Sequence, residues 1–181
     1  MQVVYRVNAP VAADHWLNDP VEGGGRILGE ACHMFDFANT LCGTPKRVLA
    51  AALPAPHGMT TVETATVTIQ YEDGSLATVH YSGVGSPALP KERIEVLRGG
   101  RSWVLDDFAE LTSFDRGRAT QAEKRQDKGH AALLARAIAA CRGEASFEPG
   151  LEAAYTAQSV ALAALESIAS GTPTEVLAPP D

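Results

Sequence analysis

The sequence lacks any long hydrophobic run, and this absence excludes a helix that crosses a membrane. No stretch of about 18 consecutive apolar residues occurs, whereas a membrane-spanning helix needs about 20. The first residues, MQVVYR, also lack the basic and apolar segments of a secretory signal. We therefore expect a cytoplasmic protein without a membrane partner.

Basic residues are too few and too scattered for nucleic acid to be the main partner. The chain has 15 Lys and Arg against 22 Asp and Glu, and its formal net charge is −7. Proteins that bind nucleic-acid phosphates cluster their basic residues instead. The apolar fraction of 45% and the charged fraction of 20% are those of an ordinary globular domain.

Cysteine is scarce, and the cysteines present are not arranged as a disulfide framework. Cys32, Cys42 and Cys141 form an odd number without close pair spacing, which is typical of free thiols in a reducing cytoplasm. Because a free cysteine usually packs as a small hydrophobic residue, we expect Cys42 and Cys141 to be buried.

The 181 residues suffice for one well-buried domain, and a strand followed by a helix opens it. Residues 3–7 are rich in β-branched and aromatic side chains and predict the strand. Apolar residues at steps of three and four predict the helix, which Gly43 ends. These apolar residues are Ile27, Ala31, Met34, Ala38 and Leu41.

The rest of the chain predicts a run of strands and then two helices. Alternating side chains and turn signals mark the strands, and alanine-rich segments mark the helices. Strands are expected at 47–53, 61–71, 76–81, 93–97, 102–105 and 111–114, helices at 129–141 and 151–170, and a strand or extended tail at 174–177.

This order predicts an α+β fold in which helices cover one face of an open, mostly antiparallel sheet. We expect residues 1–181 to form a single domain. The other face of the sheet is rich in threonine, with Thr64, Thr66 and Thr68 on the same side of one strand. Such a face suits either packing against a second copy of the chain or exposure to solvent.

Three consecutive glycines, Gly23 to Gly25, raise the question of a nucleotide-binding loop. The dinucleotide fingerprint G-x-G-x-x-G follows a hydrophobic strand and opens a βαβ unit. Here a proline-containing loop leads into the glycines, and the helix after them leads into hairpins. The G-K-[ST] of a P-loop does not occur either. The chain therefore contains no complete nucleotide-binding domain.

A metal site is a second interpretation of the glycine-rich segment, and the spacing argues against it. Cys32 and His33 are adjacent, so on a helix they point about 100° apart. Glu30 and His33 supply only two ligands, and no second cluster completes the four that a structural zinc takes. We expect no bound metal.

A polar substrate pocket is the third interpretation. On a helix, Arg26, Glu30 and His33 fall on one flank of the apolar stripe, and Asp36 lies one turn beyond His33, where it can fix the tautomer of the imidazole. The preceding glycines allow the backbone to approach a ligand closely. The alternative is an amphipathic helix with a solvated Arg–Glu pair and a histidine at its boundary.

At these residues the sequence resembles a known family. The stretch DHWLNDPVEGGGRILGEACHMFDFANTLCG is similar to the start of the C-terminal domain of the Gfo/Idh/MocA oxidoreductases, the glucose–fructose oxidoreductase and inositol dehydrogenase family. Gly25, His33 and Asp36 match the spacing of that family's triple glycine, histidine and aspartate. The stretches PKERIEVLRGGRSWVLDD and QDKGHAALL resemble its sheet and its next helix, so the resemblance covers nearly the whole chain.

The resemblance implies the substrate-binding and oligomerisation domain of a nicotinamide-dependent oxidoreductase that acts on a sugar, cyclitol or similar polyol. It implies NAD or NADP in the complete enzyme, none bound by this chain alone, and a homo-oligomer, in our expectation a dimer, formed through the free face of the sheet. The family's N-terminal nucleotide-binding domain is absent from these residues, so we expect the isolated chain to be inactive.

The resemblance also implies roles for particular residues. His33 is expected to be the acid/base, because histidine suits proton transfer near neutral pH, and Asp36 is expected to orient it. Glu30 is expected to be a further catalytic or substrate-binding carboxylate. The other expected substrate contacts are Arg26, His15, Trp16, Gly24, Gly25 and Lys128. For Trp16, covering of the core by a loop aromatic is an equal alternative to stacking on a sugar ring, and for Lys128 a solvated turn at the start of the helix is the favoured alternative.

Two departures from the family pattern keep other interpretations open. Many members have an aspartate four residues before the histidine, where this chain has Gly29. The form GE-x-CH also resembles the end of fused proteins that begin with a zinc-type alcohol dehydrogenase domain. The rival functions are a non-catalytic polyol-binding or dimerisation module, and a cofactor-free isomerase or lyase that uses His33 and Glu30.

Overall fold

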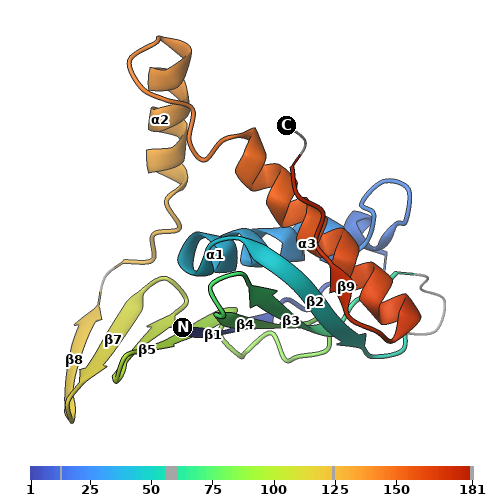
Figure 1. Ribbon diagram of the computed structural model, residues 1–181, viewed down its shortest axis with the longest axis horizontal. Coiled ribbons are helices and arrows are strands. Elements are labelled where there is room, and N and C mark those ends of the chain that lie inside the picture. The colour runs from blue at the N-terminus through green and yellow to red at the C-terminus, as the bar shows by residue number, and fades with distance from the viewer. Residues whose placement is uncertain (13, 56–60, 124, 180–181) are drawn as a thin grey trace.

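A computed structural model describes residues 1–12, 14–55, 61–123 and 125–179 of the chain. Over these residues the chain forms one open sheet with helices on one of its faces (Figure 1). This is the α+β architecture expected from the sequence. Pairing between neighbouring strands is antiparallel except where β1 lies beside β4, to which it is parallel.

The described strands follow the order β8-β7-β6-β5-β1-β4-β3-β2-β9 across the sheet. Tight turns join most sequence neighbours, and β1 is inserted between β4 and β5. The strands are β1 (Gln2–Asn8), β2 (Pro45–Ala52), β3 (Ala65–Tyr71), β4 (Leu76–Ser82), β5 (Glu92–Arg98), β6 (Arg101–Asp106), β7 (Glu110–Asp115), β8 (Arg118–Glu123) and β9 (Thr174–Glu175).

The helical segments include two irregular turns ahead of the first long helix. They are the 3₁₀ turn η1 (Trp16–Asn18), the π turn η2 (Ile27–Ala31), α1 (Cys32–Cys42), α2 (His130–Cys141) and α3 (Leu151–Ser170). α1 ends at Gly43 and α3 ends at Gly171, with φ angles of 89° and 69°. Glycine adopts these left-handed angles without the clash that a Cβ would cause.

The core lies between the sheet and the layer formed by α1 and α3. Alternate strand side chains point at these helices and are buried; they include Val3, Tyr5, Val7, Val48, Val67, Ile69, Val79 and Ile94. α3 meets α1 and β2 through small buried side chains, among them Ala157, Ala161 and Ala164. Small side chains let the helix lie close to its neighbours, so that little space is left in the core.

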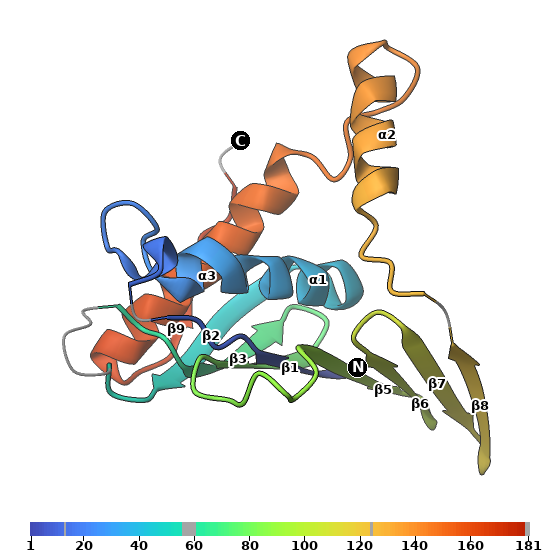
Figure 2. The same cartoon turned by 180° about the vertical axis from the view of Figure 1, so that it is seen from behind.

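α2 does not join this helix layer. Figures 1 and 2 show it standing away from the sheet, on the same side as α1 and α3. None of its residues is buried. Figure 2 also shows β7 and β8 extending beyond the cover of α1 and α3. The expected cover of one sheet face is thus provided by α1 and α3.

The opposite face of the sheet carries no helix among the described residues and has the mixed character expected from the sequence. A continuous row of paired side chains crosses it: Leu49, Thr68, Thr78, Val4, Glu95 and Val104. The hydroxyls of Thr68 and Thr78 lie 3.4 Å apart. Leu49, within the row, is 51% exposed, and Leu76, two residues from Thr78 on the same strand face, is 43% exposed. We refer to this row as the open-face band.

Four local expectations were wrong. β8 was not expected, and residues 61–64 precede β3 rather than belonging to it. Leu41 is 38% exposed, and Cys42 takes its place in the core. Three turns of an α-helix take about 11 residues, so Cys42 rather than Leu41 returns to the direction of Ala31. Cys141, expected to be buried, is exposed because it lies on α2.

Candidate functional site

The helix that carries the expected site residues begins with a π turn. Residues Ile27–Ala31 form η2, and α1 continues directly from Cys32. A π turn holds more residues per turn than an α-helix and therefore shifts the direction of the side chains on either side of it. Arg26, Glu30 and His33, expected on one flank, consequently fall into two groups with different neighbours.

The first group is His33 with Asp36. The two residues line a hollow of about 220 Å³ together with Cys32, with Pro149 and Gly150 just before α3, and with the first turns of α3. His33 is exposed, whereas Asp36 is half-buried. Burial raises the pKa of the Asp36 carboxyl, while the nearby His33 acts in the opposite direction. An accessible imidazole beside a partly desolvated carboxylate is an arrangement that can hold and move a proton.

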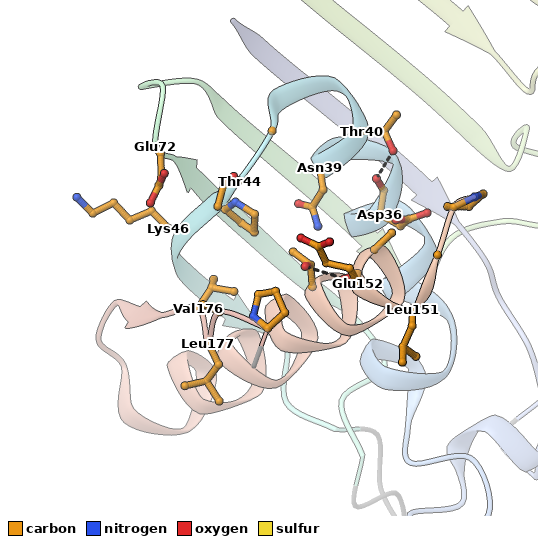
Figure 3. Close-up of a pocket in the computed structure, with 18 of the residues that line it drawn as sticks. Asp36, Asn39, Thr40, Thr44, Lys46, Glu72, Leu151, Glu152, Val176 and Leu177 are labelled. Carbon is orange, nitrogen blue, oxygen red and sulfur yellow. Dashed lines mark hydrogen bonds between the residues drawn. The ribbon is translucent and has the colours of Figure 1, made fainter. Parts of the chain in front are cut away.

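A larger hollow continues from Asp36 along α1. It has a volume of about 870 Å³ and lies between the end of α1, the beginning of α3 and the C-terminal segment (Figure 3). Figure 3 shows Asn39 and Thr40 lining it from α1 and Glu152 from α3. This volume is that of a typical small-molecule site, and Asp36 borders both hollows.

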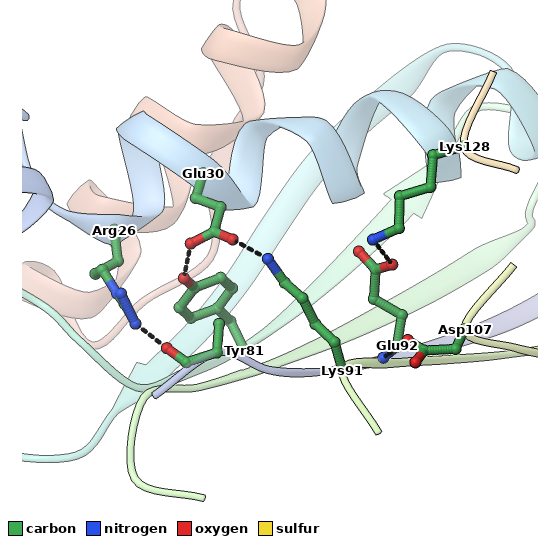
Figure 4. A network of polar contacts seen from close by, with 8 residues as sticks. Arg26, Glu30, Tyr81, Lys91, Glu92, Asp107 and Lys128 are labelled. Carbon is green, nitrogen blue, oxygen red and sulfur yellow. Dashed lines mark hydrogen bonds and ion pairs between the residues drawn. The ribbon is translucent and has the colours of Figure 1, made fainter. Parts of the chain in front are cut away.

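The second group joins Arg26 and Glu30 to the sheet (Figure 4). The Tyr81 hydroxyl, at the end of β4, donates a hydrogen bond to Glu30. The Lys91 ammonium lies 2.6 Å from the other carboxylate oxygen of Glu30. Arg26 donates to the backbone oxygen of Ala9, and its guanidinium lies 5.4 Å from the centre of the Tyr81 ring. The group thus connects the start of the helix to three strand ends.

The charges of this group stabilise one another in a partly enclosed place. Burial acts to raise the pKa of Glu30, but the hydrogen bonds from Lys91 and Tyr81 and the charge of Arg26 outweigh it, so the pKa lies below its usual value. Burial and the neighbouring Glu30 raise the pKa of Tyr81. Glu30 therefore remains ionised and Tyr81 remains a donor at neutral pH.

Arg26 is not placed to touch a substrate. Its side chain is 0% exposed, and its Nε and Nη1 atoms find no acceptor within the described ranges. This contradicts the expected direct contact, because the side chain runs between the helix and the sheet. Glu30 and Lys91 do border open space, a hollow of about 420 Å³ that Asn8 and Asp107 also line.

Lys128 belongs to a neighbouring ion pair. Its ammonium lies 2.7 Å from an oxygen of Glu92, whose side chain is 6% exposed, and 5.7 Å from the centre of the Phe108 ring. Asp107 accepts a hydrogen bond from the Glu92 backbone (Figure 4). This pairing shows a structural use for Lys128, and its expected contact with a substrate stays a prediction.

The loop before the helix folds tightly upon itself. His15 Nδ1 accepts a hydrogen bond from the Leu17 backbone at 3.3 Å, while Trp16 is 52% exposed and does not cover the core. A Cβ on Gly23 would lie 2.5 Å from the Trp16 carbonyl oxygen, and one on Gly25 would lie 2.9 Å from Thr61.

The glycines thus permit close approach of the chain to itself. Gly24 and Gly25 also adopt positive φ angles of 68° and 86°, which glycine adopts without strain. Substrate contacts by His15, Trp16, Gly24 and Gly25 remain predictions.

Gly29 occupies the position where many members of the family that the sequence resembles have an aspartate. The structure leaves no room for an aspartate side chain there. A Cβ there would lie 2.7 Å from Leu17 Cδ2 and 3.0 Å from the Gly23 oxygen. Glu30 does not replace that carboxylate, because it faces Tyr81 and Lys91 rather than His33's hollow.

Sequence reasoning missed Tyr81 and Lys91. Tyr81 lies in a strand pattern that predicts only burial, and Lys91 stands in a small basic group without a motif. Their one sequence signal is position, since each lies at the end of a strand beside the glycine-bearing helix in the folded chain. Only the pairing of β1 with β4 and β5 brings these ends together.

Neither a metal cluster nor a membrane helix is found in the part of the chain that the structure describes. No group of three or more His, Cys, Asp or Glu side chains there is placed to hold an ion. None of the helices in the described ranges is long and apolar enough to cross a membrane. Burial raises the pKa of Cys32, so this thiol beside His33 is not an activated nucleophile.

The fold and the site together define a class of protein: an open sheet whose helix-covered face presents a histidine–aspartate pair to a hollow. The family model described as the GFO/IDH/MocA C-terminal domain matches residues 1–98, more than half of the 181 residues. The chain belongs to the GFO/IDH/MocA C-terminal domain family. No curated protein sequence matches it significantly.

Solved structures share the fold over almost the whole chain. A levoglucosan dehydrogenase in complex with NADH has a TM-score of 0.84 and 15% identity, over 99% of this chain and 59% of its own. Its complex with NADH and L-sorbose gives 0.82 and 16%, with coverages of 99% and 59%. The WlbA dehydrogenase from Bordetella pertussis, in complex with NADH and UDP-GlcNAcA, gives 0.75 and 16%, with coverages of 99% and 55%. The chain therefore spans a little over half the length of these relatives.

Proposed function

We propose that this chain is the substrate-binding domain of an NAD- or NADP-dependent oxidoreductase that acts on a sugar, cyclitol or similar polyol. Family membership and the NADH complexes of the solved relatives support this proposal. The main observation behind it is that the exposed imidazole of His33 lies beside the half-buried Asp36, at the hollow that both residues line.

The described part of this chain does not form the strand–turn–helix cradle that binds a dinucleotide. A dinucleotide cradle needs a strand, a glycine turn and a helix N-terminus in succession. Here η1 and a turn precede Gly23, and the backbone of the glycines packs against Trp16 and Thr61. Hydride transfer would therefore depend on a separate nucleotide-binding domain. The role of this chain would be to bind the polyol and to accept or return the proton of its hydroxyl.

His33 is proposed to accept the proton of the reacting hydroxyl, or to return it in the reverse direction. Asp36 stabilises the protonated imidazole and fixes its orientation. Glu30 and Lys91, which border a separate hollow, can accept from and donate to hydroxyls of a polyol bound there. Tyr81 and the buried Arg26 then act as positioning residues for Glu30.

The open-face band is proposed to form a contact between two copies of the chain. It is a continuous row of threonine and valine side chains, with Leu49 and Glu95, and it has no helical cover in the described structure. Antiparallel sheets commonly pack through one such face.

The functional proposal is tested by replacing His33 in the complete oxidoreductase that contains this chain. Polyol oxidation with NAD and with NADP is followed by absorbance of the reduced cofactor, using glucose, myo-inositol and levoglucosan. H33N should lower kcat by about 10²–10⁴-fold, the range typical of a lost general base, without changing the affinity for cofactor. Unchanged turnover in H33N would show that His33 is not the acid/base.

A second candidate function is favoured by Gly29. Since Leu17 fills the space of a family aspartate, the chain could be a non-catalytic polyol-binding or dimerisation module. The complete oxidoreductase distinguishes the two functions: polyol binding by titration calorimetry with no turnover on any cofactor supports the module, whereas turnover that H33N abolishes supports the enzyme.

A further inference from the structure

The hollow beside Glu30 has walls that hydrogen bonds hold in place. Its volume of about 420 Å³ is within the range of small-molecule sites. Asn8, which is 4% exposed, donates from Nδ2 to the backbone oxygens of Ser86 at 2.8 Å and Leu89 at 2.9 Å. Its backbone N–H donates to the oxygen of Lys91 at 2.7 Å. The hollow is therefore shaped before anything binds, which lowers the entropic cost of binding.

The turn between β6 and β7 brings a second carboxylate to this hollow. Asp107 and Phe108 adopt positive φ angles of 50° and 56°, which are uncommon for residues other than glycine and unusual for a bulky one. The Glu92 backbone N–H donates to the Asp107 carboxylate at 3.0 Å. The Phe108 ring packs edge-on against the ring of Phe37. Strained conformations of this kind persist where neighbours enforce them, and they concentrate at ligand sites.

Asp107 is the carboxylate of this hollow that has no cation beside it. Lys91 pairs with Glu30 at 2.6 Å, and Lys128 pairs with Glu92 at 2.7 Å (Figure 4). Within the described ranges, no ion pair joins a basic side chain to Asp107. Two carboxylates and one ammonium therefore line the hollow, which leaves it with one negative charge in excess.

A carbonyl oxygen without a donor adds to the negative potential. Asn8 Oδ1 is buried and finds no hydrogen-bond donor in the described structure. It is enclosed next to Gly85, where an added Cβ would clash with it, so it acts on the hollow through its dipole rather than by contact. The hollow therefore favours a ligand that brings a positive charge and hydrogen-bond donors.

The lining favours an organic ammonium over a metal ion. No group of three or more His, Cys, Asp or Glu side chains among the described residues is placed to hold an ion. The rest of the lining is largely apolar and includes Pro10, Val11, Pro87 and Leu89. An apolar wall beside a few charged groups suits a ligand with a C–H face and a polar edge, such as a sugar ring.

We propose that this hollow is a subsite for the protonated amine of an amino sugar, and that Asp107 is the residue that selects for the amine. The inference rests on the proposed function. It adds to that function a site, separate from the hollow of His33, that favours substrates in which an amine is present.

Titration calorimetry with two sugars that differ at one group tests the proposal. Glucosamine and glucose carry an ammonium and a hydroxyl, respectively, at the same carbon. Each is titrated into the 181-residue chain at about pH 6, where the amine and the carboxylates are charged. Glucosamine should bind about tenfold more tightly than glucose, because a hydrogen bond between two charged groups is stronger than one to a hydroxyl. Added salt should weaken this preference.

D107N should reduce the preference to about twofold or less. Asparagine keeps the oxygen that accepts from the Glu92 backbone and tolerates a positive φ angle, but it lacks the charge. D106N is the matched control, because Asp106 pairs with Arg93 at 2.8 Å and does not line the hollow. The same loss of charge there should leave the preference unchanged, and melting temperatures of both variants report their folding.

Several results would overturn the amine subsite. They are equal affinity of the wild type for the two sugars, no saturable binding of glucosamine, a preference that D107N leaves intact, and a preference that D106N removes as well. Turnover on neutral polyols that depends on His33, together with equal binding of the two sugars, refutes the amine subsite alone. Preferred binding of glucosamine, with no turnover of either sugar by the complete oxidoreductase, refutes the enzymatic function alone.

Discussion

At the scale of single residues, Glu30 and Asp36 show how the environment gives different roles to two carboxylates of the same helical segment. Asp36 has a raised pKa because burial dominates, and Glu30 has a lowered pKa because its hydrogen bonds outweigh burial. The first environment suits a group that shares a proton with His33, and the second suits a permanent anion that holds Tyr81 and Lys91 in place.

Replacing Glu30 should therefore cost stability in a pH-dependent way. E30Q removes the anion from Tyr81 and Lys91 and should lower the free energy of unfolding at pH 7 by about 1–3 kcal/mol, as for hydrogen bonds to a charged, mostly buried group. The folded-state pKa of Glu30 is lowered, so its contribution is present above the unfolded-state pKa and is lost as pH falls through the folded value.

Urea unfolding at pH 7 and in acid measures this effect. The difference between E30Q and the wild type should shrink in acid. D115N is the control, because Asp115 pairs with Arg101 while 47% exposed, and its effect should stay within about 0.5 kcal/mol. A cost of E30Q that does not change with pH would show that charge is not its cause.

Gly29 gives a second prediction for a single residue. G29A places a Cβ 2.7 Å from Leu17 Cδ2 and should destabilise the fold by about 1–3 kcal/mol through overpacking, although alanine favours helices more than glycine does. In a double-mutant cycle measured by urea unfolding, L17A should relieve part of this cost. Strictly additive effects of G29A and L17A would exclude the clash.

At the scale of elements, the sequence pattern predicted the strands and helices well where one period dominates. The alternation in β3 and β4 and the glycine after each long helix were sufficient to predict that these elements exist and approximately where they begin and end. β8 was missed because its side chains, from Arg118 onward, do not alternate clearly between apolar and polar. The π turn could not be predicted either, since its effect is to move Arg26 and Glu30 away from His33, which depends on the sheet beneath.

The candidate site was predictable only in its local part. His33 and Asp36 lie three residues apart on one helix, so spacing alone placed them together. Tyr81 and Lys91 reach Glu30 through the insertion of β1 between β4 and β5, a long-range pairing that no local pattern encodes. The position of α2 away from the sheet could not be predicted either, because its apolar stripe is the same as that of a helix that covers the core.

The last turns of α3 offer a prediction at this scale. β9 pairs with β2 only at Arg47 and Val48. Further along β2, the Ala50 backbone N–H donates a hydrogen bond of 3.0 Å to the hydroxyl of Ser167, which is 0% exposed. S167A leaves that buried N–H unpaired and should cost about 1–3 kcal/mol. S170A, on the exposed side of the same turn, is the control for thermal unfolding, and equal melting temperatures would contradict this role.

At the scale of the whole molecule, one face of the sheet packs on the core and the other carries no helix among the described residues; we proposed above that this second face joins another copy. The open-face band pairs Thr68 with Thr78 and Val4 with Glu95 across the centre of the sheet. Arginine at Thr68 would place a desolvated charge in the middle of such an interface, which disfavours association strongly. It would leave the core unchanged, because Thr68 points away from α1 and α3.

Sedimentation equilibrium of the 181-residue chain should give twice the 19.1 kDa mass for the wild type and the single mass for T68R. L162R is the matched control: Leu162 lies on the outer side of α3 and is 53% exposed, so the same charge there should leave the dimer intact. A monomeric wild type would contradict the proposed interface, and a dimer that T68R preserves but L162R dissociates would move the contact to the helix side.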